Sequence, residues 1–311
     1  MKKYFLWIAG VVILGGIAVS LVYEKRKPAV PVADNKISVI ATIYPLAEFA
    51  RMAAGDMASV SSLVPAGVEP HEYEPTPRDL IAVEGADVFI INGAGIDPWA
   101  KNLLPTLKEK GVTVIDTSLS VELIPAASWS GEGDMSAYDP HFWLDPVFAS
   151  RIVRSIADTL SLKDPSHKSA YEETANASIR SLEKLDAEYK AALVSCAKRG
   201  IITSHDAFAY LGKRYGFDVH SIAGISPEAE PSAEHLAELI TLAKKDDIRY
   251  IFFETLVSPK VSETLAREIG AQTLVFNPIE GLSPSEVASG KNYVSVMEEN
   301  LKSLSRAREC K

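Results

Sequence analysis

The sequence predicts an α/β protein of two similar lobes, each with a four-stranded, mainly parallel sheet flanked by helices, joined by one long rigid helix. Three observations support this fold class. The chain has 311 residues, which suits two domains of roughly 100–150 residues each. Short runs rich in Val, Ile and Phe alternate with helical stretches, as in parallel α/β sheets. Four runs lie before residue 120 and four after residue 200, with one long amphipathic stretch between the two groups.

The N-terminal segment, residues 1–35, differs in composition from the rest of the chain. Two lysines are followed by an uncharged apolar run that ends at Tyr23, close to the ~20 residues that cross a bilayer. The segment also fits a secretory signal, since Ala18 to Ser20 resembles a small-residue cleavage site. We expect an export signal or an uncleaved membrane anchor with a tether, and favour the anchor. No cysteine lies near this segment, so lipid attachment there is not expected.

Eight strands are expected in the remainder of the chain. They fall into a first lobe at residues 36–163 and a second lobe at residues 197–311. The expected strands are residues 37–41, 59–64, 87–91 and 112–115 in the first lobe, and 201–204, 218–222, 250–253 and 273–276 in the second. Most are followed by helical periodicity or turn residues, which predicts parallel pairing across helical connections.

One long helix at residues 164–196 is expected to join the lobes. Asp164 is the expected cap, with Pro165 at the first helical position. Apolar residues then recur every three or four positions, at Tyr171, Ala175, Ile179, Leu182, Leu185, Tyr189 and Leu193. About thirty helical residues span ~45 Å, enough to run beside both lobes. This connection predicts a small closing movement of the lobes rather than a wide hinge.

The charge distribution argues against some classes of partner. The chain has 32 Lys/Arg and 41 Asp/Glu, a net charge of −9. Five of the basic but only two of the acidic residues lie in residues 1–35, so the remainder carries −12. Nucleic-acid binders need a basic face, whereas an acidic exported domain suits a cationic ligand. The sequence contains no phosphate loop, dinucleotide fingerprint or Gly-x-Ser-x-Gly elbow.

Three of the six histidines occupy the same kind of position. His71 lies in the loop after the second expected strand, before a helix that Thr76 is expected to cap with Pro77 at its first position. His141 lies just before a helix that Asp145 is expected to cap. His205 lies where the strand at 201–204 turns into a helix, and Glu280 follows the last strand. Ligands of open α/β sheets bind beyond the carboxyl ends of the strands. These four side chains are therefore candidates for one site.

Three imidazoles and one carboxylate suit tetrahedral Zn²⁺. The sequence has no local Cys-x-x-Cys or His-Glu-x-x-His signature, and a loop histidine can equally serve as a cap or a hydrogen-bonding residue. A ligating histidine needs a second partner to fix its tautomer. Asp139, Asp206 and Glu72 are candidates for this role, although each could be a solvated charge or a cap. The other three histidines, at positions 167, 220 and 235, are expected to be surface or structural residues.

Four motifs together resemble the metal-binding solute-binding proteins of ABC importers, the cluster A-I family, over about residues 36–305. They are Pro-His-Glu-Tyr-Glu-Pro-Thr-Pro around His71, Asp-Pro-His-Phe-Trp-Leu-Asp-Pro around His141, Thr-Ser-His-Asp-Ala-Phe around His205, and Asn-Pro-Ile-Glu-Gly-Leu around Glu280. The resemblance implies two α/β lobes with a metal ion in the cleft between them. The first lobe would supply His71 and His141, and the second would supply His205 and Glu280. Manganese-carrying members tend to have a carboxylate at position 205, so histidine there points to zinc.

The sequence departs from the family pattern in three places. Many members have aspartate at position 277, where it is the fourth ligand in some of them. This chain has Asn277 and is similar to members that use the glutamate, so Glu280 is the expected ligand, with Asn277 or a water as alternatives. The His-rich loop of many zinc members is absent from residues 126–138. The lipid-attachment cysteine common in Gram-positive members is absent as well.

The two cysteines lie outside the four motifs. Cys196 lies at the end of the expected long helix, and Cys310 is the last residue but one of the sequence. An oxidising compartment would favour a disulfide between them, which would fasten the C-terminal tail to the second lobe. Both could equally be free. Neither shares the cleft position, so neither is expected to bind the metal.

The resemblance implies a monomeric, non-enzymatic receptor outside the cytoplasm, in the periplasm or at the cell surface. It would bind Zn²⁺ with high affinity and deliver it to the membrane permease of an ABC importer. A manganese receptor, a zinc-dependent hydrolase and a surface adhesin are the alternatives. Manganese prefers more oxygen ligands than this set offers. A hydrolase would need an open fourth position for water, which Glu280 would close. An adhesin is compatible with the same fold.

Overall fold

The computed structural model describes residues 36–126 and 137–311. The expectations for the export segment at 1–35, and for most of the loop at 126–138, lie outside these residues. Residues Ile37–Lys311 form one compact unit. None of the helices in the described residues combines the length and the apolar character that crossing a membrane requires.

Two four-stranded parallel sheets confirm the predicted fold class. The first contains β1 (Ile37–Ala41), β2 (Ala58–Ser62), β3 (Val88–Ile91) and β4 (Thr113–Asp116), in the order β2-β1-β3-β4. The second contains β5 (Gly200–Thr203), β6 (Asp218–Ser221), β7 (Tyr250–Phe253) and β8 (Gln272–Val275), in the order β6-β5-β7-β8. The strand order is therefore the same in both halves, and each strand lies within two residues of its predicted bounds.

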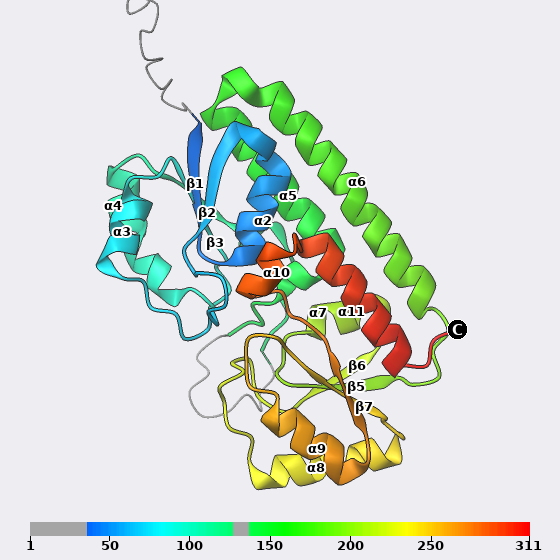
Figure 1. Ribbon diagram of the computed structural model, residues 1–311. Coiled ribbons are helices and arrows are strands. Elements are labelled where there is room, and N and C mark those ends of the chain that lie inside the picture. The colour runs from blue at the N-terminus through cyan, green and yellow to red at the C-terminus, as the bar shows by residue number, and fades with distance from the viewer. Residues whose placement is uncertain (1–35, 127–136) are drawn as a thin grey trace, which may run out of the picture. The chain divides into compact units, whose positions relative to one another are not determined.

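Helices surround the two sheets (Figure 1). They are α2 (Tyr44–Ala54), α3 (Pro77–Glu84), α4 (Leu104–Glu109), α5 (Pro146–Lys163), α6 (Lys168–Leu193), α7 (Ala209–Tyr215), α8 (Ala233–Lys245), α9 (Lys260–Ile269), α10 (Pro284–Ala288) and α11 (Tyr293–Ala307). Because helices cover both faces of a parallel sheet, its inner strands are mainly apolar. β3, for example, reads Val-Phe-Ile-Ile and is buried along its whole length.

Two of the helix starts near the candidate site follow the predicted signals. The side chain of Thr76 accepts a hydrogen bond from the backbone N–H of Asp79, and the Asp79 carboxylate accepts one from the Thr76 N–H. This capping box begins α3, with Pro77 at the first position. The side chain of Asp145 accepts a hydrogen bond from the N–H of Val147 and begins α5. Both caps fix the ends of loops that carry candidate histidines.

The long helix begins later than predicted. Residues Pro165–His167 form a single 3-10 turn, and α6 follows over Lys168–Leu193. The expectation that Asp164 caps the helix with its side chain is wrong. Its carboxylate accepts hydrogen bonds from the His167 ring, 2.6 Å away, and from the hydroxyl of Tyr171, 2.9 Å away. Both of these donors bind Oδ2, and Oδ1 accepts the hydroxyl of Ser166, so both oxygens that a cap would offer to the backbone are occupied.

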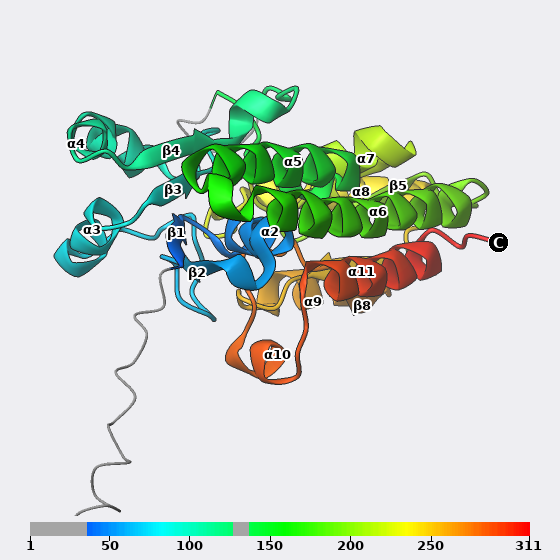
Figure 2. The same cartoon turned by 90° about the horizontal axis from the view of Figure 1, so that it is seen from above.

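The buried face of α6 agrees with the predicted periodicity. Six of the seven predicted positions are buried, and the seventh, Ile179, is partly buried against the same core. The helix packs against α2, α5 and α11 (Figures 1 and 2). One hydrophobic core continues from the first half of the chain into the second. Trp143 of the first half and Phe276 of the second half, for example, belong to the same cluster of buried side chains. The lobe boundaries at 36–163, 164–196 and 197–311 therefore stay a prediction.

Candidate metal centre

The structure brings the four predicted side chains, His71, His141, His205 and Glu280, to one point. One ligand atom from each lies within 4.8 Å of the others. The Nε2 atoms of the three histidines lie 3.3, 3.1 and 3.0 Å from Oε1 of Glu280, in chain order. The first and last members are 209 positions apart in the sequence. Only the fold, and no local motif, assembles this cluster.

The spacing of these atoms fits a small tetrahedral cation. Four ligands placed ~2.0–2.1 Å from a zinc ion in a tetrahedron lie ~3.3–3.4 Å from one another. The Nε2 of His141 lies 3.2 Å from that of His71 and 3.4 Å from that of His205. The cluster is also buried, since His141 and His205 are fully enclosed and Glu280 is 1% exposed. The side chain of His71 is 7% exposed and is the most accessible of the four.

Hydrogen bonds fix the loop that carries His71 at two places, residue 67 and residue 71. The carboxylate of Glu69 accepts the backbone N–H of His71, at 3.1 and 3.0 Å to its two oxygens. The N–H of Gly67 donates to the carbonyl of Leu282, 2.9 Å away. This second bond ties the His71 loop to the segment directly after Glu280. Two cluster members that are distant in sequence are thereby linked through the backbone.

His141 is oriented by the aspartate two residues before it. Oδ1 of Asp139 accepts the backbone N–H of His141 at 2.9 Å and its ring Nδ1–H at 2.8 Å. Because an ionised carboxylate only accepts, the proton lies on Nδ1, and Nε2 is left to face Glu280. The surrounding segment is held from the second half of the chain. The hydroxyl of Tyr210 donates to the carbonyl of Asp139, and Nε1 of Trp143 donates to the carbonyl of Pro278, both at 2.8 Å.

His205 is oriented by a residue that the sequence did not suggest. Oε1 of Glu254 lies 2.7 Å from Nδ1 of His205 and also accepts the hydroxyl of Ser204. Asp206 is adjacent in sequence, but the carboxylate on the His205 ring is that of Glu254. Glu72, the third suggestion, is exposed. Glu254 was missed because it is 49 positions from His205. Its position directly after β7 was the available signal, since it resembles the positions of the predicted ligands.

The fourth side chain of the cluster is that of Glu280 and not that of Asn277. The amide of Asn277 is used locally: Oδ1 accepts the N–H of Ile279 at 2.7 Å, and Nδ2 donates to the hydroxyl of Thr255 at 3.1 Å. Oε2 of Glu280 is buried and has no hydrogen-bond partner among the described residues. A buried carboxylate oxygen without a donor is costly unless a cation balances it. The donor set and this oxygen together point to a bound metal ion.

Burial and neighbouring carboxylates set the protonation of the metal-free cluster. Burial alone would lower the pKa of His141, but Asp139 and Glu280 outweigh it and raise this pKa to about 9. Burial likewise opposes charge on His205, but Glu254 and Glu280 raise its pKa well above the usual value. Two imidazolium groups are therefore expected at neutral pH.

The other two members of the cluster carry the opposite shifts. Burial lowers the pKa of His71, so this imidazole is neutral at pH 7. Burial would raise the pKa of Glu280, but His205 and His141 outweigh it and lower this pKa well below its usual value. The metal-free cluster thus holds an ionised carboxylate, two protonated imidazoles and one neutral imidazole.

Zinc binding is expected to release about two protons at pH 7, because the metal needs the Nε2 lone pairs of His141 and His205. Protons compete for these atoms, so the affinity should fall as the pH falls and rise as the pH approaches 9. With two protons displaced, the change is about 100-fold per pH unit. Titration calorimetry in buffers of different ionisation enthalpy measures the number of protons. Release of none at pH 7 would contradict the protonation described above.

The two orienting carboxylates should matter for metal affinity although neither would touch the metal. Replacing Asp139 with Asn or Glu254 with Gln is expected to weaken zinc binding by about 10- to 100-fold, because an amide supports the imidazole less well. Chelator competition measures the change. Asp206→Asn is the matched control, since Asp206 adjoins His205 in sequence, whereas the carboxylate on the Nδ1 of that ring is that of Glu254. Equal losses in all three variants would show a general charge effect instead.

Comparison with known proteins identifies relatives across the compact unit. The family model described as zinc-uptake complex component A, periplasmic (ZnuA) matches residues 39–307, a range that includes all four cluster residues. The zinc-binding lipoprotein AdcA of Streptococcus pneumoniae is 39% identical, with 98% of this chain and 60% of AdcA covered. The high-affinity zinc uptake system protein ZnuA of Bacillus subtilis is 38% identical, with 87% of each chain covered.

Solved structures confirm the same similarity at the level of the fold. The Zn(II)-bound structure of Streptococcus pneumoniae AdcA is 40% identical, with a TM-score of 0.78 over 88% of this chain and 58% of that one. The laminin-binding protein Lmb of Streptococcus agalactiae is 31% identical, with a TM-score of 0.79 over 88% of this chain and 99% of that one. The chain spans about three fifths of the length of AdcA.

Proposed function

This chain belongs to the family of the periplasmic zinc-uptake component A, and from that premise we propose that it is an extracytoplasmic receptor for Zn²⁺. It binds the ion through His71, His141, His205 and Glu280 and delivers it to the membrane permease of an ABC importer. The observation that carries this proposal is the convergence of three Nε2 atoms and one carboxylate oxygen at tetrahedral spacing. The zinc named in the descriptions of AdcA and ZnuA supports the same cargo.

Zinc fits the donor set better than manganese does. Three imidazole nitrogens and one oxygen suit four-coordinate Zn²⁺, whereas Mn²⁺ prefers more oxygen ligands and a higher coordination number. Copper and nickel can bind nitrogen-rich sites as tightly in vitro, because affinity follows the Irving–Williams order. We therefore propose zinc as the ion that the protein carries in the cell, and not as the only ion that the site can bind.

A receptor fits the site better than a hydrolase. Catalytic zinc keeps one position open for water, while in this cluster Glu280 provides a fourth protein ligand. The relatives are named for zinc binding and uptake, and we propose that this chain has no enzymatic activity. The laminin-binding relative shares the fold, but a shared fold does not carry an adhesive surface with it.

The same proposal covers location and partners. The segment at 1–35, with its apolar run, directs the chain out of the cytoplasm. Outside the cytoplasm the protein acts as a monomer and meets the permease. Lobes at 36–163 and 197–311 enclose the ion, and the helix at 164–196 keeps their closing movement small. The acidic remainder of the chain attracts divalent cations.

Titration of metal-stripped protein tests the proposal. We expect one Zn²⁺ per chain, bound far more tightly than Mn²⁺, in competition with a chromophoric chelator. X-ray absorption of the zinc-loaded protein should show four nitrogen or oxygen ligands, three of them imidazole. Failure to bind zinc, or tighter binding of manganese, would overturn the receptor function as stated. A water in the fourth position would favour the hydrolase.

A further inference from the structure

Hydrogen bonds from side chains hold the backbone of residues 277–279, the turn that precedes Glu280. Asn300 of α11 grips residue 277 from both sides: its Oδ1 accepts the N–H of Asn277 at 2.8 Å, and its Nδ2 donates to the carbonyl of Asn277 at 2.7 Å. The next carbonyl, of Pro278, accepts Nε1 of Trp143. The N–H of Ile279 donates to the Asn277 side chain at 2.7 Å. Glu280 follows directly.

Ile279 adopts a backbone conformation that its residue type disfavours. Its φ is +58°, in the left-handed region, and its side chain is fully buried. A β-branched residue there is strained and persists only where the surroundings enforce the conformation. The side chain of Asn277 supplies that enforcement, because its amide oxygen holds the Ile279 N–H in an Asx-type turn. Strain of this kind is typical of functional sites.

Packing alone does not explain Asn300. The residue is 2% exposed and lies within a helix, where asparagine is a poor helix former. A buried amide is costly unless its polar atoms are paired. Both the oxygen and the nitrogen of the Asn300 amide are paired with the backbone of a single residue, Asn277. The side chain therefore fixes the backbone of one residue on both its N–H and its C=O side, three residues before Glu280.

We propose that Asn277 and Asn300 are positioning residues for zinc binding, which fix the strained turn that points Oε1 of Glu280 at the three histidines. This role rests on the proposed function. Neither residue touches the metal, and both act through Glu280. The amide at position 277 also keeps that side chain out of the coordination sphere, because its oxygen and nitrogen are committed to Ile279 and Thr255.

Alanine variants of the full chain give the first test. Asn277→Ala and Asn300→Ala are each expected to weaken zinc binding by about 10- to 100-fold. They should also change the visible absorption spectrum of the Co²⁺-loaded protein, because a misplaced Glu280 alters the tetrahedral geometry. Asn292→Ala is the matched control on the same helix. Asn292 caps α11 and is exposed, so its loss lowers stability without altering affinity or spectrum.

A conservative variant separates positioning from general stability. The serine hydroxyl of Asn277→Ser can still accept the Ile279 N–H, so this variant should bind zinc more tightly than Asn277→Ala and keep the wild-type Co²⁺ spectrum. If Asn300→Ala does not fold, the Asn277→Ser and Asn277→Ala pair decides the outcome. Wild-type affinity and spectrum in Asn277→Ala would overturn the positioning role and leave the receptor standing. Failure of the wild type itself to bind zinc or cobalt would overturn the receptor.

Discussion

His141→Ala is expected to lower the affinity for zinc by about 100- to 1000-fold. Structural zinc sites contribute roughly 10–16 kcal/mol, so the loss of one of four ligands removes about 2.5–4 kcal/mol. His141 contacts every other member of the cluster, since its Nε2 lies within 3.4 Å of a ligand atom of His71, His205 and Glu280 alike.

Competition against a chelator of known affinity measures this loss. His167→Ala is the control, because that histidine lies at the start of the linking helix, about half exposed, and is expected to leave affinity unchanged. His141→Ala also leaves Asp139 buried without the imidazole, so some loss of thermal stability should accompany it. An unchanged zinc affinity in His141→Ala would contradict the proposed ligand set.

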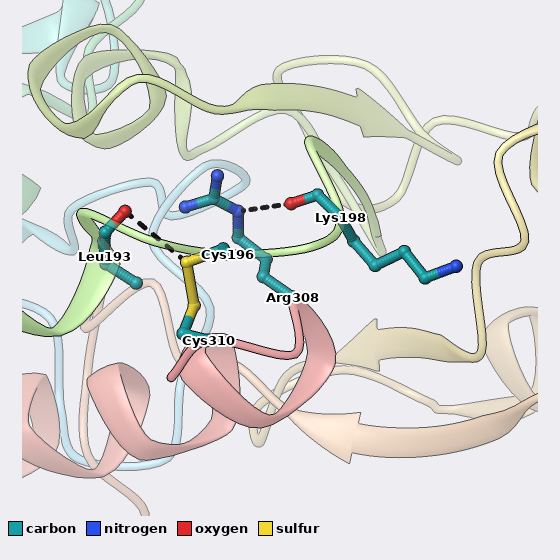
Figure 3. The surroundings of a disulfide bond; sticks show 5 residues. All are labelled: Leu193, Cys196, Lys198, Arg308 and Cys310. Atoms are coloured by element: carbon teal, nitrogen blue, oxygen red, sulfur yellow. Dashed lines mark hydrogen bonds between the residues drawn. A yellow bond between two sulfur atoms is a disulfide. The ribbon is translucent and has the colours of Figure 1, made fainter.

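Removal of the disulfide is expected to lower the free energy of unfolding by about 2–5 kcal/mol. The structure joins Cys196 and Cys310, which answers the question that the sequence left open (Figure 3). The bond closes a loop of 114 positions that contains the whole second sheet. A cross-link over so long a loop restricts the unfolded chain strongly. Nearby, the backbone N–H of Lys198 donates to the carbonyl of Arg308, so the tail is held by hydrogen bonds as well.

Urea unfolding of the Cys196→Ser/Cys310→Ser variant, compared with the wild type, measures the contribution. Reductant should destabilise the wild type to nearly the same extent and should leave the double variant unaffected. A wild type that unfolds at the same urea concentration with and without reductant would show that the bond contributes nothing.

The fold could be predicted in detail because its signals are local. The bounds of β1 and β7 match the prediction to the residue, since each strand is an apolar run ended by turn residues. The caps at Thr76 and Asp145 were equally readable. The start of α6 was not predictable in this way. The Asp164 carboxylate accepts hydrogen bonds from side chains two, three and seven positions later, and the local sequence does not show that these donors replace the backbone N–H groups.

The site was only partly predictable. The candidate ligands were found because each follows a strand or precedes a capped helix, and the structure brings all four together. Their supporting residues were harder to find. Asp139 was suggested by its closeness in sequence to His141, but the same reasoning selected Asp206 and Glu72 where the structure has Glu254. The hydrogen bonds between Asn300 and Asn277 join residues 23 positions apart. The sequence around either residue gives no sign of this contact.

The protonation of the metal-free cluster affects how a binding partner can distinguish the metal-free form from the zinc-bound form. At neutral pH the raised pKa values of His141 and His205 predict one additional proton on each ring when the metal is absent, and Zn²⁺ is expected to displace both. The incoming ion brings the same charge that the two protons take away. The buried cluster therefore has the same net charge in its empty and loaded forms, and the electric field outside the molecule changes little. A partner that must distinguish the two forms has to sense a difference in shape.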